Sequence, residues 1–314
     1  MKKALHLILI LSLFISCKNK LNIQPKYSDF ETDLEARNLF GKVKEFSQFR
    51  ANIKGSDKNQ TEKQIIKLKE SFNKNGFAKS SEYFDTFGIT QQTTENFYDV
   101  NNYLQKSITI GQNFPKKMVE LIERDTIKKT AFRKIVINDS LNYQFQSTLG
   151  KLDRIEKQTR IENGDTTQIN YNYKLDSNEN VIFVEEIGGK EKNINEYKYD
   201  ENGNVVESIN GTDFFKIKTV TNYKDNRIIK VENYTISADL KQHLESITEF
   251  DNYYNPINEK TYQNSELNRE TKNEYEFDNN GNWIKKTVYL KEHFANSKKF
   301  IPIYIESREI EYWK

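Results

Sequence analysis

Apolar and polar residues alternate along most of this chain with a period of two. Aromatic and charged residues alternate in stretches such as Tyr-Lys-Tyr at 197–199 and Tyr-Glu-Phe at 275–277. This alternation is typical of a β-strand with one buried face and one exposed face. It begins after Gly41, and Val43, Phe46 and Phe49 mark the first expected strand. The pattern therefore predicts an all-β fold.

A degenerate repeat underlies the alternation. Five aromatic residues each open a stretch rich in Asp and Asn, and successive ones lie 26, 24, 27 and 27 positions apart. They are Tyr173, Tyr199, Tyr223, Phe250 and Phe277, with weaker upstream counterparts at Phe145, Tyr98 and Phe72. We count about eight or nine units, clearest over residues 171–290. A fixed period of this length indicates stacked structural units.

Each clear unit predicts a hairpin. The turns Asp-Glu-Asn-Gly at 200–203 and Asp-Asn-Asn-Gly at 278–281 contain Asn-Gly, which accepts positive φ readily. The return strands start at Asn204 and Asn282, and a variable linker follows. Because a lone hairpin is only marginally stable, we expect the units to stack. Residues 36–314 are predicted to form antiparallel repeated β-hairpins, arranged as a solenoid or an extended twisted meander.

The first 35 residues have a different character. Lys2 and Lys3 precede an apolar stretch at 4–15, and Ser16 leads to Cys17, the one cysteine in the chain. The stretch is shorter than the roughly 20 residues of a spanning helix and is typical of a signal peptide. Phe-Ile-Ser-Cys at 14–17 resembles the lipobox of bacterial lipoproteins. That resemblance implies a signal peptide at 1–16 and a lipidated tether at 17–35. The near-helical spacing of Leu34, Arg37 and Asn38 indicates a short helix near 29–38.

Charge and composition narrow the function classes. Removing Lys2 and Lys3 with the signal lowers the 48 basic residues to 46, against 46 acidic residues. A balanced charge gives no electrostatic case for binding nucleic acid. The mean hydropathy is −0.85, and we find no second apolar stretch long enough to span a membrane. With Cys17 lipidated, no thiol is left for a disulfide or a metal site.

One repeat pattern resembles a known family. Tyr-x-Tyr-Asp-x-Asn-Gly-Asn, complete at 197–204 and nearly complete at 275–282, resembles the YD repeat of the Rhs family. The whole layout, including the opening stretch at 39–45, resembles the small Rhs/YD-repeat lipoproteins of Gram-negative bacteria. In large Rhs proteins such repeats wind into a shell around a toxin. This chain has too few units for a closed shell, so the resemblance implies the β-repeat architecture without an encapsulating role.

The turns also have the alternating oxygen ligands of a calcium loop. Such a loop requires glycine at its sixth position and a bidentate glutamate at its twelfth. In the turns at 200–204 and 278–282 glycine is fourth, and the twelfth positions are Gly211 and Tyr289. Hydrogen bonds within each turn explain the pattern, and we expect no metal and no other cofactor.

No catalytic constellation stands out. His6 lies in the signal, and His243 and His293 lie 50 residues apart in variable linkers. Glu274 and Glu276 flank Tyr275 on an expected solvent face, where they would serve as cross-strand partners of Lys285. We assign no catalytic residue and predict a protein that is not an enzyme.

The sequence favours a non-enzymatic binding or scaffold lipoprotein of the cell envelope, with a protein or polysaccharide as partner. Trp283 and Trp313 are candidate ligand-stacking residues, and core packing is the alternative. Two other functions stay open: a carboxylate-dependent glycan hydrolase, and an immunity or accessory partner of a polymorphic toxin. The lipid bilayer is an expected partner through acylated Cys17. We expect an outer-membrane anchor on the periplasmic face.

Overall fold

The computed structural model describes residues 32–112, 116–125, 127–150, 154–162, 164–188, 191–293 and 299–314. Cys17, the signal peptide and residues 17–31 of the expected tether lie outside them. No helix in these ranges is long and apolar enough to cross a membrane. The elements are α2 (Asp33–Ala36), β1 (Val43–Asn52), β2 (Ile65–Phe72), β3 (Ala78–Phe84), β4 (Thr90–Tyr98), β5 (Leu104–Gly111), β6 (Lys117–Asp125), β7 (Thr130–Ile137), β8 (Ser140–Leu149), β9 (Ile155–Glu162), β10 (Asp165–Leu175), β11 (Val181–Gly188), β12 (Glu191–Tyr199), β13 (Val205–Gly211), β14 (Phe215–Lys224), β15 (Arg227–Ser237), β16 (Gln242–Phe250), β17 (Pro256–Gln263), β18 (Glu266–Phe277), β19 (Trp283–Glu292) and β20 (Ile301–Tyr312).

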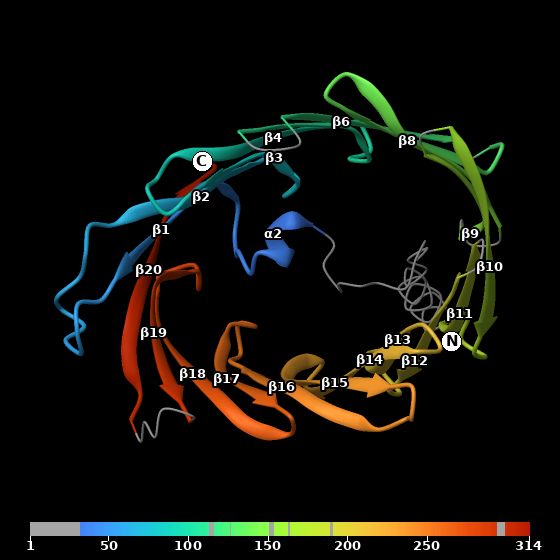
Figure 1. Ribbon diagram of the computed structural model, residues 1–314. Coiled ribbons are helices and arrows are strands. Elements are labelled where there is room, and N and C mark those ends of the chain that lie inside the picture. The colour runs from blue at the N-terminus through green and yellow to red at the C-terminus, as the bar shows by residue number, and fades with distance from the viewer. Residues whose placement is uncertain are drawn as a thin grey trace, which may run out of the picture.

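The strands form one antiparallel sheet that closes on itself (Figure 1). Each strand pairs with the next along the chain, and β1 also pairs with β20. That last pairing runs from Val43 opposite Tyr312 to Asn52 opposite Tyr304. A sheet whose first and last strands pair is a barrel without a free edge. We call the β20–β1 pairing the closing seam.

This closure corrects part of the predicted architecture. The all-β antiparallel fold is confirmed, but the solenoid or extended meander is wrong. The prediction that the units are too few to close is wrong as well. A β-bulge accompanies the turns of most hairpins, for example at Lys198/Tyr199 and at Glu276/Phe277. Bulges bend a strand and increase its twist, so a run of bulged hairpins curves until β20 meets β1.

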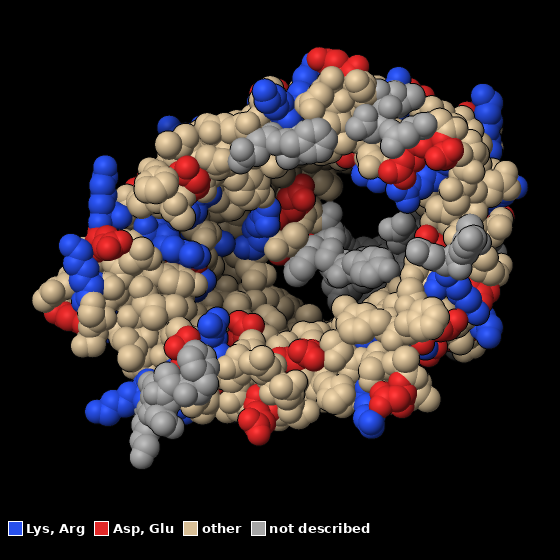
Figure 2. All heavy atoms as spheres, viewed as in Figure 1, with Lys and Arg blue, Asp and Glu red and all other residues tan. Residues whose placement is uncertain are grey.

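The strand register separates an inner face from an outer face. α2 lies inside the ring (Figure 1), and Leu34 and Leu39 pack with Val43, Phe46 and Phe72 in one buried cluster. The face that carries Phe46 is therefore the inner face. Charged side chains lie both around the outside of the ring and on its hollowed inner side (Figure 2).

The predicted turns are confirmed, and their own aspartates hold them. Asp200 Oδ1 accepts hydrogen bonds from the backbone N–H groups of Asn202 (2.9 Å) and Asn204 (2.8 Å). Gly203 takes the left-handed conformation at φ +81°, which suits glycine. The same pair of bonds recurs in the turns that begin at Asn73, Asp85, Asp99, Asp176, Asp251 and Asp278. The backbone thus occupies these oxygens, as the sequence predicts.

Tyrosine hydroxyls connect neighbouring turns along one rim of the barrel. Tyr199, at the end of β12, donates a hydrogen bond to the carbonyl of Val181 at the start of β11 (2.8 Å). Equivalent bonds join Tyr98 to Ala78 (2.9 Å), Tyr173 to Ile155 (2.8 Å), Tyr223 to Val205 (3.2 Å) and Tyr275 to Pro256 (2.9 Å). These bonds give the recurring aromatic a structural role where it is a tyrosine, and in the unit of Phe277 the nearby Tyr275 makes the bond instead.

Residues 32–42, which we call the seam clasp, cross the closing seam on its inner side. Their helix α2 opens with a capping box at 32–35, which satisfies otherwise free backbone N–H groups. The Leu34 N–H donates to the Gly76 carbonyl in the β2–β3 turn (3.1 Å). The Asn38 amide donates to the Tyr254 carbonyl in the β16–β17 turn (2.9 Å). The clasp therefore joins turns on opposite sides of the seam.

Asn282 is the polar centre of the clasp contact. Its side chain is fully buried. Its Oδ1 accepts from the Phe40 N–H (2.6 Å), and its Nδ2 donates to the Phe40 carbonyl (2.9 Å) and to the Tyr312 hydroxyl (2.7 Å). A buried backbone group costs free energy when it has no partner, so Asn282 fixes the clasp to the barrel.

We predict that Asn282→Ala lowers the free energy of unfolding by about 1–3 kcal/mol, because it removes the buried amide that pairs with the Phe40 N–H and carbonyl. The matched control is Asn180→Ala, since Asn180 occupies the equivalent turn position and its amide donates to Asp176 of its own turn (2.9 Å). Denaturant unfolding measures both variants. Equal losses in the two would contradict the anchoring role of Asn282.

Candidate functional site: the inner wall at the closing seam

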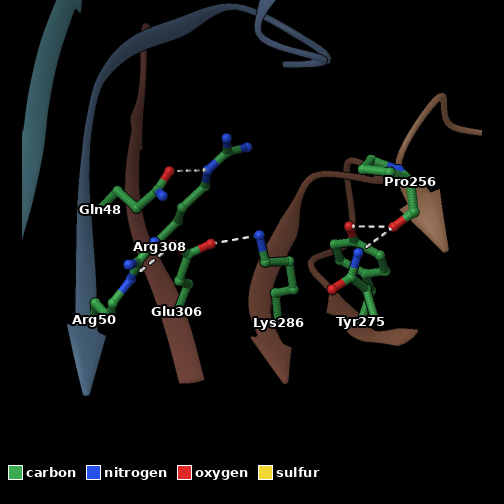
Figure 3. A network of polar contacts seen from close by, with 8 residues as sticks. Gln48, Arg50, Pro256, Tyr275, Lys286, Glu306 and Arg308 are labelled. Atoms are coloured by element: carbon green, nitrogen blue, oxygen red, sulfur yellow. Dashed lines mark hydrogen bonds and ion pairs between the residues drawn. The ribbon is translucent and has the colours of Figure 1, made fainter. Parts of the chain in front are cut away.

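A buried ion network spans β1, β19 and β20 on the inner face (Figure 3). Glu306 is 3% exposed. It accepts from Arg50 Nη2 (2.6 Å) and Nε (3.2 Å), and Lys286 Nζ lies 2.5 Å from its second oxygen. Each of the three strands that form this part of the wall therefore contributes one charge to the network.

Two opposing effects set the pKa of Glu306. Burial favours the neutral carboxyl, but the attraction and hydrogen bonds of Lys286 and Arg50 outweigh it and hold the pKa below its ordinary value. Glu306 is therefore ionised at neutral pH and contributes to stability as an anion. Removing one partner of a buried pair is costly, because it leaves the other charge unmatched.

A second ion pair ties the clasp to the same wall. Arg37, which ends α2, donates from Nε (2.8 Å) and Nη2 (2.7 Å) to the two oxygens of Glu70. The Glu70 side chain is 3% exposed. Such a two-bond contact fixes orientation as well as distance. Glu70 and Glu306 are thus each engaged by a basic residue.

Arg308 differs from these residues because no carboxylate of the described chain pairs with it. Its guanidinium stacks on Trp283, 3.7 Å from the ring centroid, and lies 5.1 Å from the ring of Phe46. Its Nε donates to Gln48 Oε1 (3.3 Å), whereas Nη1 is buried and has no hydrogen-bond partner. Figure 3 shows the terminal nitrogens pointing away from Gln48 and Glu306. Burial lowers the pKa of Arg308 to about 9.

A hollow of about 510 Å³ lies elsewhere on the inner wall, across β9 to β12. Arg160 and Glu162 pair within it (2.5 Å), and burial raises the pKa of Glu186. Asp165, Thr167 and Asn193 complete its polar lining. The acidic groups of this hollow outnumber its single arginine, so it differs in charge from the seam.

The candidate residues from the sequence lie in different places. Trp283 is 6% exposed, on the inner face, and packs against Tyr275 as well as Arg308. Trp313 follows β20 and lies 5.7 Å from the ammonium groups of both Lys44 and Lys74. Ligand stacking at either tryptophan stays a prediction.

The predicted pairing of Lys285 is confirmed for Glu276, whose Oε1 lies 2.7 Å from its Nζ. Glu274 instead contacts Lys272 (2.9 Å) and Tyr289 (2.8 Å). His293 contacts Glu270 (2.7 Å) just after β19, and His243 lies in β16. The described residues contain no group of three or more His, Cys, Asp or Glu that could hold a metal ion. The prediction of no catalytic residue is not tested by these contacts.

The sequence analysis missed the seam network. The sequence carries one sign of it, in β20. Glu306 and Arg308 lie between Tyr304 and Ile310 on the same face of the strand, which the alternation predicts to be apolar. Charges at core-facing positions of a strand indicate a polar network or a site. Their partners on β1 lie more than 250 residues away and are not visible in the sequence.

The fold was compared with known proteins. No protein-family model and no curated protein matches the chain. A porin-like protein from Bacteroides uniformis matches over 86% of this chain and 96% of its own, with 11% identity and a TM-score of 0.32. A porin-like protein from Bacteroides vulgatus matches over 84% and 97%, with 9% identity and a TM-score of 0.29. The TcdB2–TccC3 structure matches over 82% of this chain and 19% of its own, with 10% identity and a TM-score of 0.21. Such low scores assign no function.

The closed barrel overturns the predicted function. A YD-repeat scaffold module that offers an open hairpin sheet to a protein or polysaccharide is wrong, because the sheet has no open edge and one of its faces lies inside the ring. Neither alternative, a glycan hydrolase or a toxin immunity partner, follows from a closed barrel. The RHS and YD-repeat description of the chain as a hairpin solenoid is wrong for the same reason.

We predict that the Glu306 network makes the barrel sensitive to acid. Because its pKa in the folded protein lies below 4.5, its contribution is present above that pH and is lost as the pH falls through the folded value. Glu306→Gln should lower stability at pH 7 by about 1–3 kcal/mol, because Arg50 and Lys286 keep some contact with solvent, and it should flatten the loss of stability below pH 4.5. Thermal unfolding from pH 3 to 7 measures this, and parallel pH profiles of variant and wild type would refute it.

Proposed function

We propose that this protein is a lipid-anchored barrel of the cell envelope that encloses a ligand inside its wall and is not an enzyme. The observation that carries this proposal is a closed wall with charged residues on both faces. The lipid anchor is the acylated Cys17 that the sequence predicts, and residues 17–31 connect it to the seam clasp.

The outer face supports a barrel surrounded by water. Ion pairs lie in the outer rows of several strands, where a membrane-spanning barrel has an apolar band. They join Lys285 to Glu276 (2.7 Å), Lys198 to Glu207 (2.7 Å) and Lys192 to Glu185 (2.6 Å). A Lys at the bilayer midplane of such a barrel costs about 2–4 kcal/mol. Rows of such charges therefore favour a tethered barrel over an inserted one.

The inner face supports a polar ligand. It carries hydroxyl and amide groups, such as the pairs Thr94–Thr109 and Thr219–Asn233. Its charged groups include the seam network, the hollow across β9 to β12 and the Arg133–Glu120 pair. An inner wall of this kind binds a ligand through hydrogen bonds and charges rather than through apolar burial. Glu70 and Glu306 already have basic partners, so they hold the wall together and leave no free carboxylate pair at the seam for acid–base chemistry.

We predict that Cys17→Ser releases the protein from membranes. The native chain should incorporate a fatty-acid analogue and sediment with membranes, whereas the variant should be unlabelled and appear in the soluble envelope fraction. Cell fractionation and gel fluorescence measure both properties. A Cys17→Ser protein that stays in the membrane after carbonate washing would show that the barrel itself is inserted, and the proposal would fail.

A further inference from the structure

The charges at the seam do not balance. Glu306 is shared by Arg50 and Lys286, and Glu70 is held by Arg37. The electrostatic neighbours of Arg308 are Glu306 and Tyr275, then Arg37 and Glu70, so both carboxylates near it already serve other cations. Among Arg308, its electrostatic neighbours and their ion partners in the described residues, four basic groups therefore face two acidic ones. Arg308 is the basic residue of this group that forms no ion pair with a carboxylate of the described chain.

One terminal nitrogen of the Arg308 guanidinium has no hydrogen-bond acceptor among the described residues. The planar guanidinium is held from one side by Trp283 and from another by Phe46, and Gln48 fixes its Nε. The terminal Nη1 has no acceptor although it is buried. Buried donors in native proteins are nearly always paired, with protein, water or a bound group. A stacked, oriented guanidinium is the arrangement that recognises carboxylate and phosphate groups through two parallel bonds.

We propose that Arg308 binds an oxyanion, a carboxylate or phosphate group, of the ligand that the barrel encloses. This inference rests on the proposed function and names the chemistry of its ligand. The bound oxyanion accepts from the terminal nitrogens and balances the charge at the seam. The lowered pKa of Arg308 agrees with a cation that is buried without its counter-ion.

Trp283 provides a local readout of binding. The chain has two tryptophans, so Trp313→Phe makes Trp283 the single tryptophan, whose emission is excited selectively at wavelengths that tyrosine does not absorb. We would titrate this protein, extracted from membranes, with sodium phosphate and with sodium succinate at constant ionic strength, and with sodium chloride as the salt control. We expect a saturable change of Trp283 emission with phosphate, with succinate or with both, and none with chloride. The two anions distinguish a phosphate ligand from a carboxylate ligand.

Arg308→Gln tests the residue itself, and we expect it to weaken the response by at least about tenfold. The matched control is Arg133→Gln. Arg133 also faces inward, lies over an aromatic ring (5.5 Å from the Phe145 centroid) and has a carboxylate partner, Glu120 (2.5 Å). Its loss should leave the titration unchanged. Arg308→Lys keeps the positive charge but loses the planar guanidinium, so we expect it to bind the anion with intermediate affinity. This variant also tests the assignment if Arg308→Gln does not fold.

A response that persists at full strength in Arg308→Gln, or no saturable response to either anion, would overturn the assignment of Arg308. Native mass spectrometry of the extracted wild-type barrel separates this failure from failure of the proposed function. A retained cationic or neutral molecule would keep the enclosing role and refute the anion site. A retained carboxylate or phosphate compound that is lost in Arg308→Gln would support both.

Discussion

The pairing of β1 with β20 is the contact on which the rest of the barrel depends. It turns a long row of hairpins into a ring, and it removes the two free strand edges that would otherwise invite pairing with other chains. It also separates an inner face from an outer face, so the alternation of side chains along each strand determines which of them face the interior and which face outward. The seam is reinforced from inside. Asn282 fixes the clasp at one turn, and the bidentate contact between Arg37 and Glu70 fixes it at β2.

A wall with ion pairs on its outer face and polar groups on its inner face has little room for an apolar core. The buried apolar residues accordingly gather in small groups, one under the clasp and one around Val184 and Tyr197. Between these groups the wall relies on the hydrogen bonds of its strand pairs and on repeated local devices, the aspartate turn and the tyrosine bond to the previous turn. Each of these devices contributes modestly, and their number compensates for the small cores.

The local structure could be predicted from the sequence because its causes are local. Asp200 and Gly203 determine their turn within five residues, and the alternation in β18 determines which side chains share a face. The closure could not be predicted, because Val43 and Tyr312 meet only if the curvature of every intervening hairpin adds up correctly. The site at Arg308 was missed for a related reason. The side chains around Arg308 are Phe46 and Gln48 of β1 and Trp283 of β19. They are far from it in sequence, so no local motif of histidines or paired carboxylates marks the position.

The two strands of the seam lie at opposite ends of the described chain, and this separation in sequence has a consequence for how the barrel forms. Because β1 is synthesised first and β20 last, the N-terminal strand has one unpaired edge for as long as the chain is still emerging, and closure requires a contact of very high sequence separation. Contacts of this kind form slowly, since the entropy of bringing distant segments together is lost before the pairing compensates for it. A chain that ends before Ile301 would keep two open edges permanently. The ring can therefore close only after β20, a strand of 12 residues, has been made, and a fragment without it exposes two unpaired edges that favour aggregation.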